Sequence, residues 1–361
     1  MSALIQFEKG LFGSFGHITL QRPKALNALN LEMILGLSRV LDEWEKDPSV
    51  LAVIIQSSDE RAFCAGGDIR TIYELGMKKD TEIFTFFKQE YALNQKIARY
   101  TKPYISFMNG ITMGGGVGIS LHGSHCVAGK NFQFAMPETG IGFFPDIGSS
   151  YLLNRCPGAF GMYLGLSGAR LNAQEAYDLK LVNYCIEDNQ PVIEALHQLN
   201  LEKNAHQTVT DLLSKFHKTP STSSSITHSL PWINEIFSQN SVEDIIKELT
   251  SLTIVEAPLV GDRNNEQVLN PDLIKKTLED LKSKSPFSLK VTFELLKRTR
   301  GKTVEESLAI DSILVQHFLK DKDFYEGVRA LLVDKDKQPK WEPPNLESIS
   351  AQQVNEYFKA N

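Results

Sequence analysis

Cysteine is scarce in this chain of 361 residues: there are four, and no two of them form a Cys-x-x-Cys pair. That spacing argues against a disulfide framework or a zinc knuckle and favours buried thiols in a reducing compartment. Long apolar runs are also missing, since none approaches the roughly twenty residues that would span a bilayer. The segment Met1–Lys9 has neither an apolar signal core nor an Arg- and Ser-rich leader. We therefore expect a cytoplasmic protein, with a transit peptide that has already been removed as the open alternative.

An excess of positive charge is lacking as well. The 38 Lys and Arg residues are outnumbered by 44 Asp and Glu residues, giving a formal net charge of −6. Such a chain has no bulk attraction for nucleic acid or an anionic membrane, and we expect neither as a partner. A phosphate-bearing ligand would need a local basic patch. With 42% hydrophobic residues, the chain is long enough for one large core or about two domains.

Short β patterns alternate with helical patterns in the first half of the chain. The expected strands are Leu4–Phe7, His17–Leu20, Leu51–Gln56, Ile105–Met108 and Cys126–Ala128. A glycine-rich turn at Gly10, Gly13 and Gly16 should join the first two. Helices are expected from an N-cap at Asn30 to about residue 46, and over about residues 81–99. Alternation of this kind predicts an α/β core.

The pattern becomes mostly helical after about Asn172. Helices are expected at about Leu289–Thr299 and Thr303–Leu319, and a polar loop at Thr219–Thr227. We expect two domains: residues 1–190, which carry the α/β core and the site described next, and residues 191–361, which are mostly helical.

Two glycine-containing turns, Arg61–Arg70 and Asn109–Gly118, each follow an expected strand. Glycine lets the backbone adopt positive φ and lets a ligand approach it closely. Two N–H groups presented in this way, those of Gly67 and Gly115, could bind one carbonyl oxygen as it becomes negative. Each such donor is commonly worth about 10²–10³-fold in rate. Either turn taken alone is equally consistent with an ordinary structural turn.

Two carboxylates, Glu138 and Asp146, lie among glycines, prolines and phenylalanines. The glycines and the proline between them forbid one continuous helix, so an irregular loop sets their separation. Their apolar neighbours would desolvate a carboxylate and raise its pKa. Two acids in unequal environments can divide the roles of nucleophile or base and proton donor.

The same region offers weaker evidence for three other kinds of site. A dinucleotide-binding fingerprint is broken at Ile119, where its third glycine should stand. A serine-nucleophile elbow is broken at His122, where Gly-x-Ser-x-Gly should end. His122 and His125 have the spacing of metal ligands on a helix, but the sequence suggests no third ligand, and a polar helix end explains them better.

The paired turns resemble a known family. Ala65–Ile69 and Met113–Gly118 look like the signature of the crotonase (enoyl-CoA hydratase/isomerase) superfamily, whose members hold an acyl-CoA thioester oxygen between two backbone N–H groups. Within it, the chain most resembles hydrolases of short 3-hydroxyacyl-CoA thioesters. Four stretches carry that closer match: Arg22–Leu29, Gly110–Gly118, Phe134–Asp146 and Asp323–Asp336. The resemblance implies a spiral of ββα units, followed by a helical C-terminal region that covers the acyl pocket.

The resemblance also implies roles for individual residues. Gly67 and Gly115 become the oxyanion donors, Glu138 the catalytic glutamate and Asp146 the second acid of the hydrolase. Glu90 falls on a substrate-contacting glutamate, although its position in a helix would otherwise suggest an exposed carboxylate.

Other positions match those that line the CoA nucleotide and pantetheine: Lys24, Ala25, Leu26, Ala65, Asp68 and Ile69. Arg22 and Lys24 would supply the local positive charge that CoA phosphates require in a net-acidic protein.

One departure from the wider superfamily concerns the reaction. Hydratases carry a second glutamate on the helix after the oxyanion turn, where this chain has Gly118. The resemblance therefore favours hydrolysis, with 3-hydroxyisobutyryl-CoA of valine breakdown as the expected substrate and no metal or redox cofactor. An enoyl-CoA isomerase or hydratase, or a non-catalytic acyl-CoA-binding protein, remains the alternative, and the oligomeric state stays open. Ser149 and Ser150 stand where the hydrolases usually have glycine.

Overall fold

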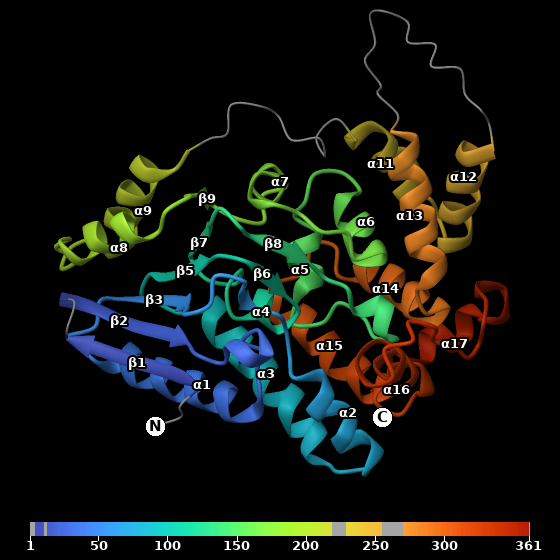
Figure 1. The fold of residues 1–361 in the computed structure, drawn as a ribbon, viewed down its shortest axis with the longest axis horizontal. Helices are drawn as coiled ribbons and strands as arrows, with labels where there is room; N and C mark the ends of the chain where they lie inside the picture. Colours follow the sequence, from blue (N-terminus) through green and yellow to red (C-terminus); the bar gives the residue numbers. More distant parts are fainter. Residues whose placement is uncertain (1–3, 11–12, 219–228, 255–269, 361) are drawn as a thin grey trace, which may run out of the picture. The chain divides into compact units, whose positions relative to one another are not determined.

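The computed structural model describes residues 4–10, 13–218, 229–254 and 270–360 (Figure 1). These residues form two compact units that alternate along the chain. The first unit takes residues 1–75, 79–135 and 171–221, and the second takes residues 76–78, 136–170 and 222–361. The domain division expected at residue 190 stays a prediction. Of the expected glycine-rich turn, Gly13 and Gly16 lie within strand β2, so that part of the prediction is wrong. Residues 11–12 and the expected loop Thr219–Thr227 lie outside the described residues.

Two sheets form the centre of the first unit (Figure 1). The larger has the order β1-β2-β3-β5-β7-β9, and the smaller has the order β4-β6-β8. The pair β1–β2 is antiparallel, and every other pairing is parallel. The strands are β1 (Ile5–Gly10), β2 (Gly13–Leu20), β3 (Ala52–Ser57), β4 (Ala62–Cys64), β5 (Tyr104–Met108), β6 (Ile111–Met113), β7 (His125–Ala128), β8 (Gln133–Ala135) and β9 (Tyr184–Cys185).

From β3 onward, consecutive strands alternate between the two sheets. Strands β3, β5 and β7 belong to the large sheet, while β4, β6 and β8 belong to the small one. The chain therefore repeats one unit, a strand in each sheet followed by helical residues, which confirms the expected α/β spiral. The run Ala52–Ile55 is buried at every position, as expected of a parallel strand covered on both faces.

The helices assigned wholly or mostly to the first unit surround these sheets. They are η1 (Pro23–Ala25), α1 (Leu31–Lys46), α2 (Ile69–Met77), α3 (Glu82–Ala98), α4 (Gly115–Gly118), α7 (Ala173–Asp178), α8 (Gln190–His197) and α9 (Ala205–Phe216). The N-cap predicted at Asn30 is confirmed, because its Oδ1 accepts the Met33 N–H at 2.9 Å. The hydrophobic core joins sheet residues such as Ile54 and Phe107 to Val192 of α8 and Val209 of α9.

Every secondary-structure element that the structure describes in the second unit is a helix (Figure 1). Its elements are η2 (Glu138–Ile141), α5 (Ser149–Leu153), α6 (Phe160–Ser167), α11 (Leu230–Phe237), α12 (Val242–Ile254), α13 (Pro271–Ser283), α14 (Pro286–Arg298), α15 (Val304–Phe318), α16 (Lys322–Val328), η3 (Arg329–Val333), η4 (Leu346–Ser348) and α17 (Ala351–Glu356). The expected helix at 303–319 is confirmed as α15, and Thr303 with Glu306 forms a capping box at its start. Across the described ranges of both units, no helix is long and apolar enough to cross a membrane.

Candidate active site

The first glycine turn follows β4 and is hydrogen-bonded to Leu29. The Leu29 N–H donates to the Gly66 carbonyl at 2.8 Å, and the Asp68 N–H donates to the Leu29 carbonyl at 2.7 Å. In such a parallel bridge the bonds come from the residues flanking Gly67, so the Gly67 N–H is not used by its partner strand. Gly66 has φ +117°, a conformation that other residues rarely adopt. Among the bonds of the described residues, none uses the Gly67 N–H as donor.

The second glycine turn begins the short helix α4. Gly114, with φ +45°, is its N-cap, and Gly115 is its first residue. The first N–H groups of a helix have no acceptor within the helix, and in the described chain the Gly115 N–H donates no bond. A Cβ built on Gly115 would lie 3.3 Å from the Gly67 nitrogen and 2.4 Å from Glu90 Oε1. The first unit therefore brings both predicted oxyanion donors and Glu90 together.

Glu90 is buried and not the exposed helix carboxylate that its position alone suggested. It is 2% exposed and lies on the inward face of α3, between Phe86 and Asn94. Asn94, one turn further on, is fully buried, and neither atom of its amide has a hydrogen-bond partner in the described chain. Sequence reasoning did not single out Asn94. The available signal was a polar side chain on the apolar stripe of the helix.

The residues expected to line CoA occur in two adjoining turns of the first unit. Lys24 lies exposed in η1, whereas Leu26 and Ala65 are half-buried and joined by a hydrogen bond from the Ala65 N–H to the Leu26 carbonyl, 3.0 Å long. Three more half-buried residues belong to the same set: Ala25, Asp68 and Ile69.

The positive charge of Arg22, expected to serve the CoA phosphates, is engaged within the protein. Its guanidinium forms an ion pair with Asp68 at 2.7 Å and donates a second bond to the Ala28 carbonyl at 2.8 Å. Asp68 also accepts the Thr71 N–H at the start of α2. Arg22 therefore links the two turns, and Lys24 is the cation of the expected pair that remains exposed.

Both predicted acids belong to the second unit. Glu138 begins η2 and is 8% exposed, and its buried Oε2 has no hydrogen-bond partner among the described residues. Burial, and secondarily the charge of Asp146, raises the pKa of Glu138 well above its usual range. A carboxyl in this state is protonated to an unusually high pH and becomes a strongly basic carboxylate once ionised.

Asp146 is 6% exposed and lies at the end of an aromatic segment. The predicted irregular loop is confirmed, since η2 ends at Ile141 and α5 begins only at Ser149. Phe143 packs against Phe318 and Phe324 with ring centroids 5.5 and 5.4 Å away. These contacts join the loop to α15 and α16.

Asp311 is a third buried carboxyl of this region that sequence reasoning missed. It is fully buried in α15, and its Oδ2 accepts the Gly148 N–H at 2.7 Å. Burial, followed by the charge of Asp146, raises the pKa of Asp311 well above its usual range. The sequence did contain a signal, because Asp311 falls on the buried stripe of this helix between Leu308 and Leu314.

The described residues contain no cluster of three or more His, Cys, Asp and Glu side chains that could hold a metal ion. His125 lies in strand β7 and not at a helix end, and its ring hydrogen-bonds Thr210 at 3.1 Å. All four cysteines are buried thiols, as expected.

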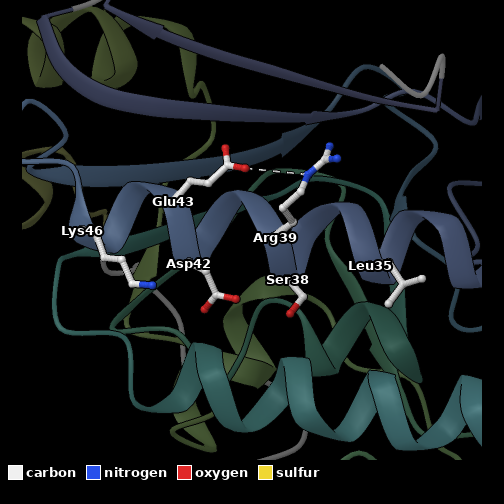
Figure 2. Close-up of a pocket in the computed structure, with 6 residues that line it drawn as sticks. All are labelled: Leu35, Ser38, Arg39, Asp42, Glu43 and Lys46. Carbon is white, nitrogen blue, oxygen red and sulfur yellow. Dashed lines mark ion pairs between the residues drawn. The ribbon is translucent and has the colours of Figure 1, made fainter.

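A hollow along α1 contains none of the predicted site residues (Figure 2). The residues that line it are Leu35, Ser38, Arg39, Asp42, Glu43 and Lys46. Arg39 pairs with Glu43 at 3.9 Å, and Asp42 pairs with Lys96 of α3 at 2.6 Å. Because these ion pairs neutralise much of the charge that lines the hollow, we assign no catalytic or binding role to it.

A family model described as enoyl-CoA hydratase/isomerase matches residues 15–358 of this sequence. The chain belongs to the enoyl-CoA hydratase/isomerase family. It is 40% identical to a mitochondrial 3-hydroxyisobutyryl-CoA hydrolase of Xenopus tropicalis, over 96% of this chain and 86% of that protein. The relative of the same name in Dictyostelium discoideum is 40% identical over 98% of this chain and 91% of its own length. The human one is 37% identical, over 96% and 87%.

Solved structures of the family have the same fold. A carnitinyl-CoA dehydratase from Mycobacterium thermoresistibile matches with a TM-score of 0.86 and 32% identity, covering 100% of this chain and 97% of that one. An enoyl-CoA hydratase from Rhodobacter sphaeroides matches with a TM-score of 0.83 and 29% identity, covering 99% and 97%.

The expectation of a cytoplasmic protein is wrong, because curated relatives that match nearly the whole chain are named mitochondrial. The reasoning failed because buried thiols and a lack of disulfides report on redox state and packing, and neither property identifies an organelle.

Proposed function

We propose that this protein hydrolyses a short 3-hydroxyacyl-CoA thioester, with 3-hydroxyisobutyryl-CoA as substrate and 3-hydroxyisobutyrate and CoA as products. The observation that carries the proposal is a sequence identity of 37–40%, over nearly the whole chain, to relatives named for that activity. Valine breakdown, the setting expected from the resemblance, would supply this thioester.

In the proposed reaction the thioester oxygen accepts hydrogen bonds from the Gly67 and Gly115 N–H groups. The support is their unused donor capacity and their proximity to each other in the first unit. Preorganised donors of this kind stabilise the negative charge that develops on the oxygen, with about 10²–10³-fold in rate for each. Glu90, buried beside Gly115, would position the acyl group.

Glu138 is proposed to be the residue that reacts at the carbonyl carbon of the thioester. As a carboxylate it would attack that carbon, the C–S bond would break, and CoA would leave as a thiolate that takes a proton. Water would then cleave the mixed anhydride, giving the free acid and regenerating Glu138. In the competing route Glu138 acts as a general base on water, which attacks the thioester directly. Asp146 would orient the 3-hydroxyl or protonate the departing thiolate.

The proposed reaction needs no metal ion or redox cofactor, because water is its only co-substrate. Lys24, Ala25, Leu26, Ala65, Asp68 and Ile69 are proposed to line the bound CoA.

Release of free thiol from 3-hydroxyisobutyryl-CoA tests the proposal, with crotonyl-CoA hydration measured in parallel. Thiol release that is lost in Glu138→Ala is the expected result. Hydration or double-bond migration without thiol release would refute hydrolysis. A single turnover in H₂¹⁸O then addresses the route, since label in the Glu138 side chain requires the anhydride and label confined to the product favours the general base.

An enoyl-CoA hydratase or isomerase activity is the second candidate. Two structural relatives carry dehydratase and hydratase names at 32% and 29% identity, which is the observation in its favour. Against it stands Gly118, where the resemblance places the second glutamate of hydratases. A Cβ at this position would lie 2.6 Å from Asn94 Nδ2, so any side chain at position 118 would require Asn94 to move.

A further inference from the structure

Asp311 is a buried aspartate whose environment is unusual. It lies on the apolar stripe of α15 and is fully buried, whereas aspartates are almost never buried unless they are paired. No ion pair of the described residues includes it. One carboxyl oxygen accepts the Gly148 N–H, and the other, Oδ1, has no hydrogen-bond partner in the described chain. A group of this kind in a core calls for an explanation.

The hydrogen bond from Gly148 holds a strained turn. Ile147 has φ +59° and Gly148 has φ +71°, and a β-branched residue with positive φ is a genuine outlier. Such a conformation persists only where the surrounding structure enforces it, and it occurs preferentially at functional sites. The turn directly follows Asp146, whose carbonyl accepts the Ser149 N–H at 3.0 Å. Through the 2.7 Å bond, α15 therefore fixes the backbone that carries Asp146.

Few charged side chains lie on the elements that pack around Asp311. Asp146 is the neighbouring carboxylate whose field acts on it, and burial together with that field raises the pKa of Asp311 well above its usual range. Helix α5, which packs on α15, carries no Asp, Glu, Lys or Arg.

Helix α16 also packs on α15, and it carries three charged side chains that are engaged elsewhere. Lys322 pairs with Glu342, Glu326 pairs with Arg329, and Asp323 accepts the Ser285 hydroxyl. A neutral Asp311 can thus occupy this position without adding a second negative charge beside Asp146.

We propose that Asp311, buried in the core, is a positioning residue for the hydrolysis: its hydrogen bond to the Gly148 N–H fixes the strained turn that orients Asp146. The inference rests on the proposed function, because it concerns the part that Asp146 plays in thioester cleavage. Asp311 itself contacts neither substrate nor reacting atoms in this account.

Two substitutions distinguish the hydrogen-bond acceptor of Asp311 from its ability to carry a charge. Asp311→Asn keeps a side-chain oxygen for the Gly148 N–H but cannot ionise, while Asp311→Leu removes the acceptor and keeps an apolar volume. Asp323→Asn is the matched control, since Asp323 is 2% exposed and accepts the Glu342 N–H at 2.8 Å in the same unit. Thermal midpoints of all variants establish that each is folded.

We expect Asp311→Leu to lower kcat by about 10–10²-fold with KM changed by less than about threefold, because misplacing a reacting group by about 1 Å can lose 10²-fold. Asp311→Asn should keep kcat within about threefold. The control should retain kcat. Normal kcat in a folded Asp311→Leu, or a loss of kcat in Asp311→Asn as large as in Asp311→Leu, would overturn the proposal.

Failure of the proposed function would appear differently, as an absence of thiol release from the wild type. Exchange of the Gly148 amide proton tests the positioning contact without any substrate. It should be at least about tenfold faster in Asp311→Leu and unchanged in Asp323→Asn, because only the first variant frees this amide. Unchanged exchange in Asp311→Leu would refute the contact even in an active enzyme.

Discussion

Glu138 is the residue at which the chemistry and the stability of the protein oppose each other. Its raised pKa means that burial favours the protonated form, whereas the proposed reaction uses the carboxylate. A raised folded-state pKa contributes stability that is fully present below the unfolded pKa and is lost as the pH rises through the folded value. Ionisation therefore weakens the fold under the same conditions that activate the residue.

Glu138→Gln should reveal both sides of this opposition. We expect kcat to fall by about 10²–10⁴-fold, because the amide is neither a nucleophile nor a base. The thermal midpoint of the variant should exceed that of the wild type at pH 8 and approach it at low pH, since glutamine cannot ionise. Thiol-release kinetics and melting curves between pH 5 and 8 measure the two effects. Unchanged turnover would instead favour a non-catalytic acyl-CoA-binding protein.

Gly115 gives a second prediction at the residue scale. In Gly115→Ala the new methyl would lie 2.4 Å from Glu90 Oε1. It would therefore displace the Glu90 carboxyl from the N–H groups of Gly67 and Gly115. We expect kcat/KM to fall by about 10²-fold, as is typical when an oxyanion donor is disturbed.

Gly36→Ala is the matched control for this substitution. Its Cβ would come no closer than 3.6 Å to Phe7, and Gly36 lies within α1. It should keep full activity and gain roughly 0.5–1 kcal/mol of stability, because alanine loses less conformational freedom in a helix. Equal activity of both variants would contradict the donor assignment.

Sequence reasoning predicted some residues of the candidate site and missed others for a physical reason. Gly67 and Gly115 were found because glycines after strands are a local signal, and Glu138 with Asp146 because a loop and its apolar neighbours are visible in the sequence. The burial of Glu90 and the contact of Asp311 with Gly148 depend on residues far apart in the chain, up to 163 positions in the latter case. A polar residue on an apolar helical stripe was the one local sign of both.

At the scale of elements, the long helices and most strands of the large sheet were predictable. Strands β4, β6 and β8 were not, because each has three residues and cannot show a period of two. Their strand conformation comes from pairing with one another, which only the folded chain reveals.

The contact between η2 and α16 leads to a prediction about stability. Gly142 ends η2 with φ +69°, and a Cβ there would lie 2.2 Å from the Asp323 carbonyl oxygen in α16. Gly301 has a similar φ of +73° with nothing within 4 Å of its Cβ position.

Gly301→Ala should therefore lower the free energy of unfolding by about 1–2 kcal/mol, the conformational cost alone. Gly142→Ala should lower it by a further 1–3 kcal/mol or so, because α16 must move. Denaturant unfolding measures both variants. Equal losses would mean that α16 accommodates the methyl freely and does not fix the end of η2.

For the molecule as a whole, two buried histidines of the first unit and two buried carboxyls of the second respond to pH in opposite directions. In the first unit, burial and then His197 lower the pKa of His17 to about 4, and burial and then His206 lower that of His125 to about 4. Their contribution to stability is present above the usual histidine pKa of 6.5 and is lost as the pH falls toward 4. In the second unit, Glu138 and Asp311 have raised pKa values, so protonation stabilises it as the pH falls.

Lowering the pH from 7 to 5 should therefore destabilise the first unit relative to the second. Native-state hydrogen exchange, corrected for intrinsic rates, should show protection falling in β2, β7 and α8, while that of η2 and α15 is maintained or rises. The combined variant Glu138→Gln and Asp311→Asn should remove the response of the second unit and leave that of the first intact. Protection that falls equally in both units of the wild type would contradict this assignment, because protonation of buried acids and protonation of buried histidines must change stability with opposite sign.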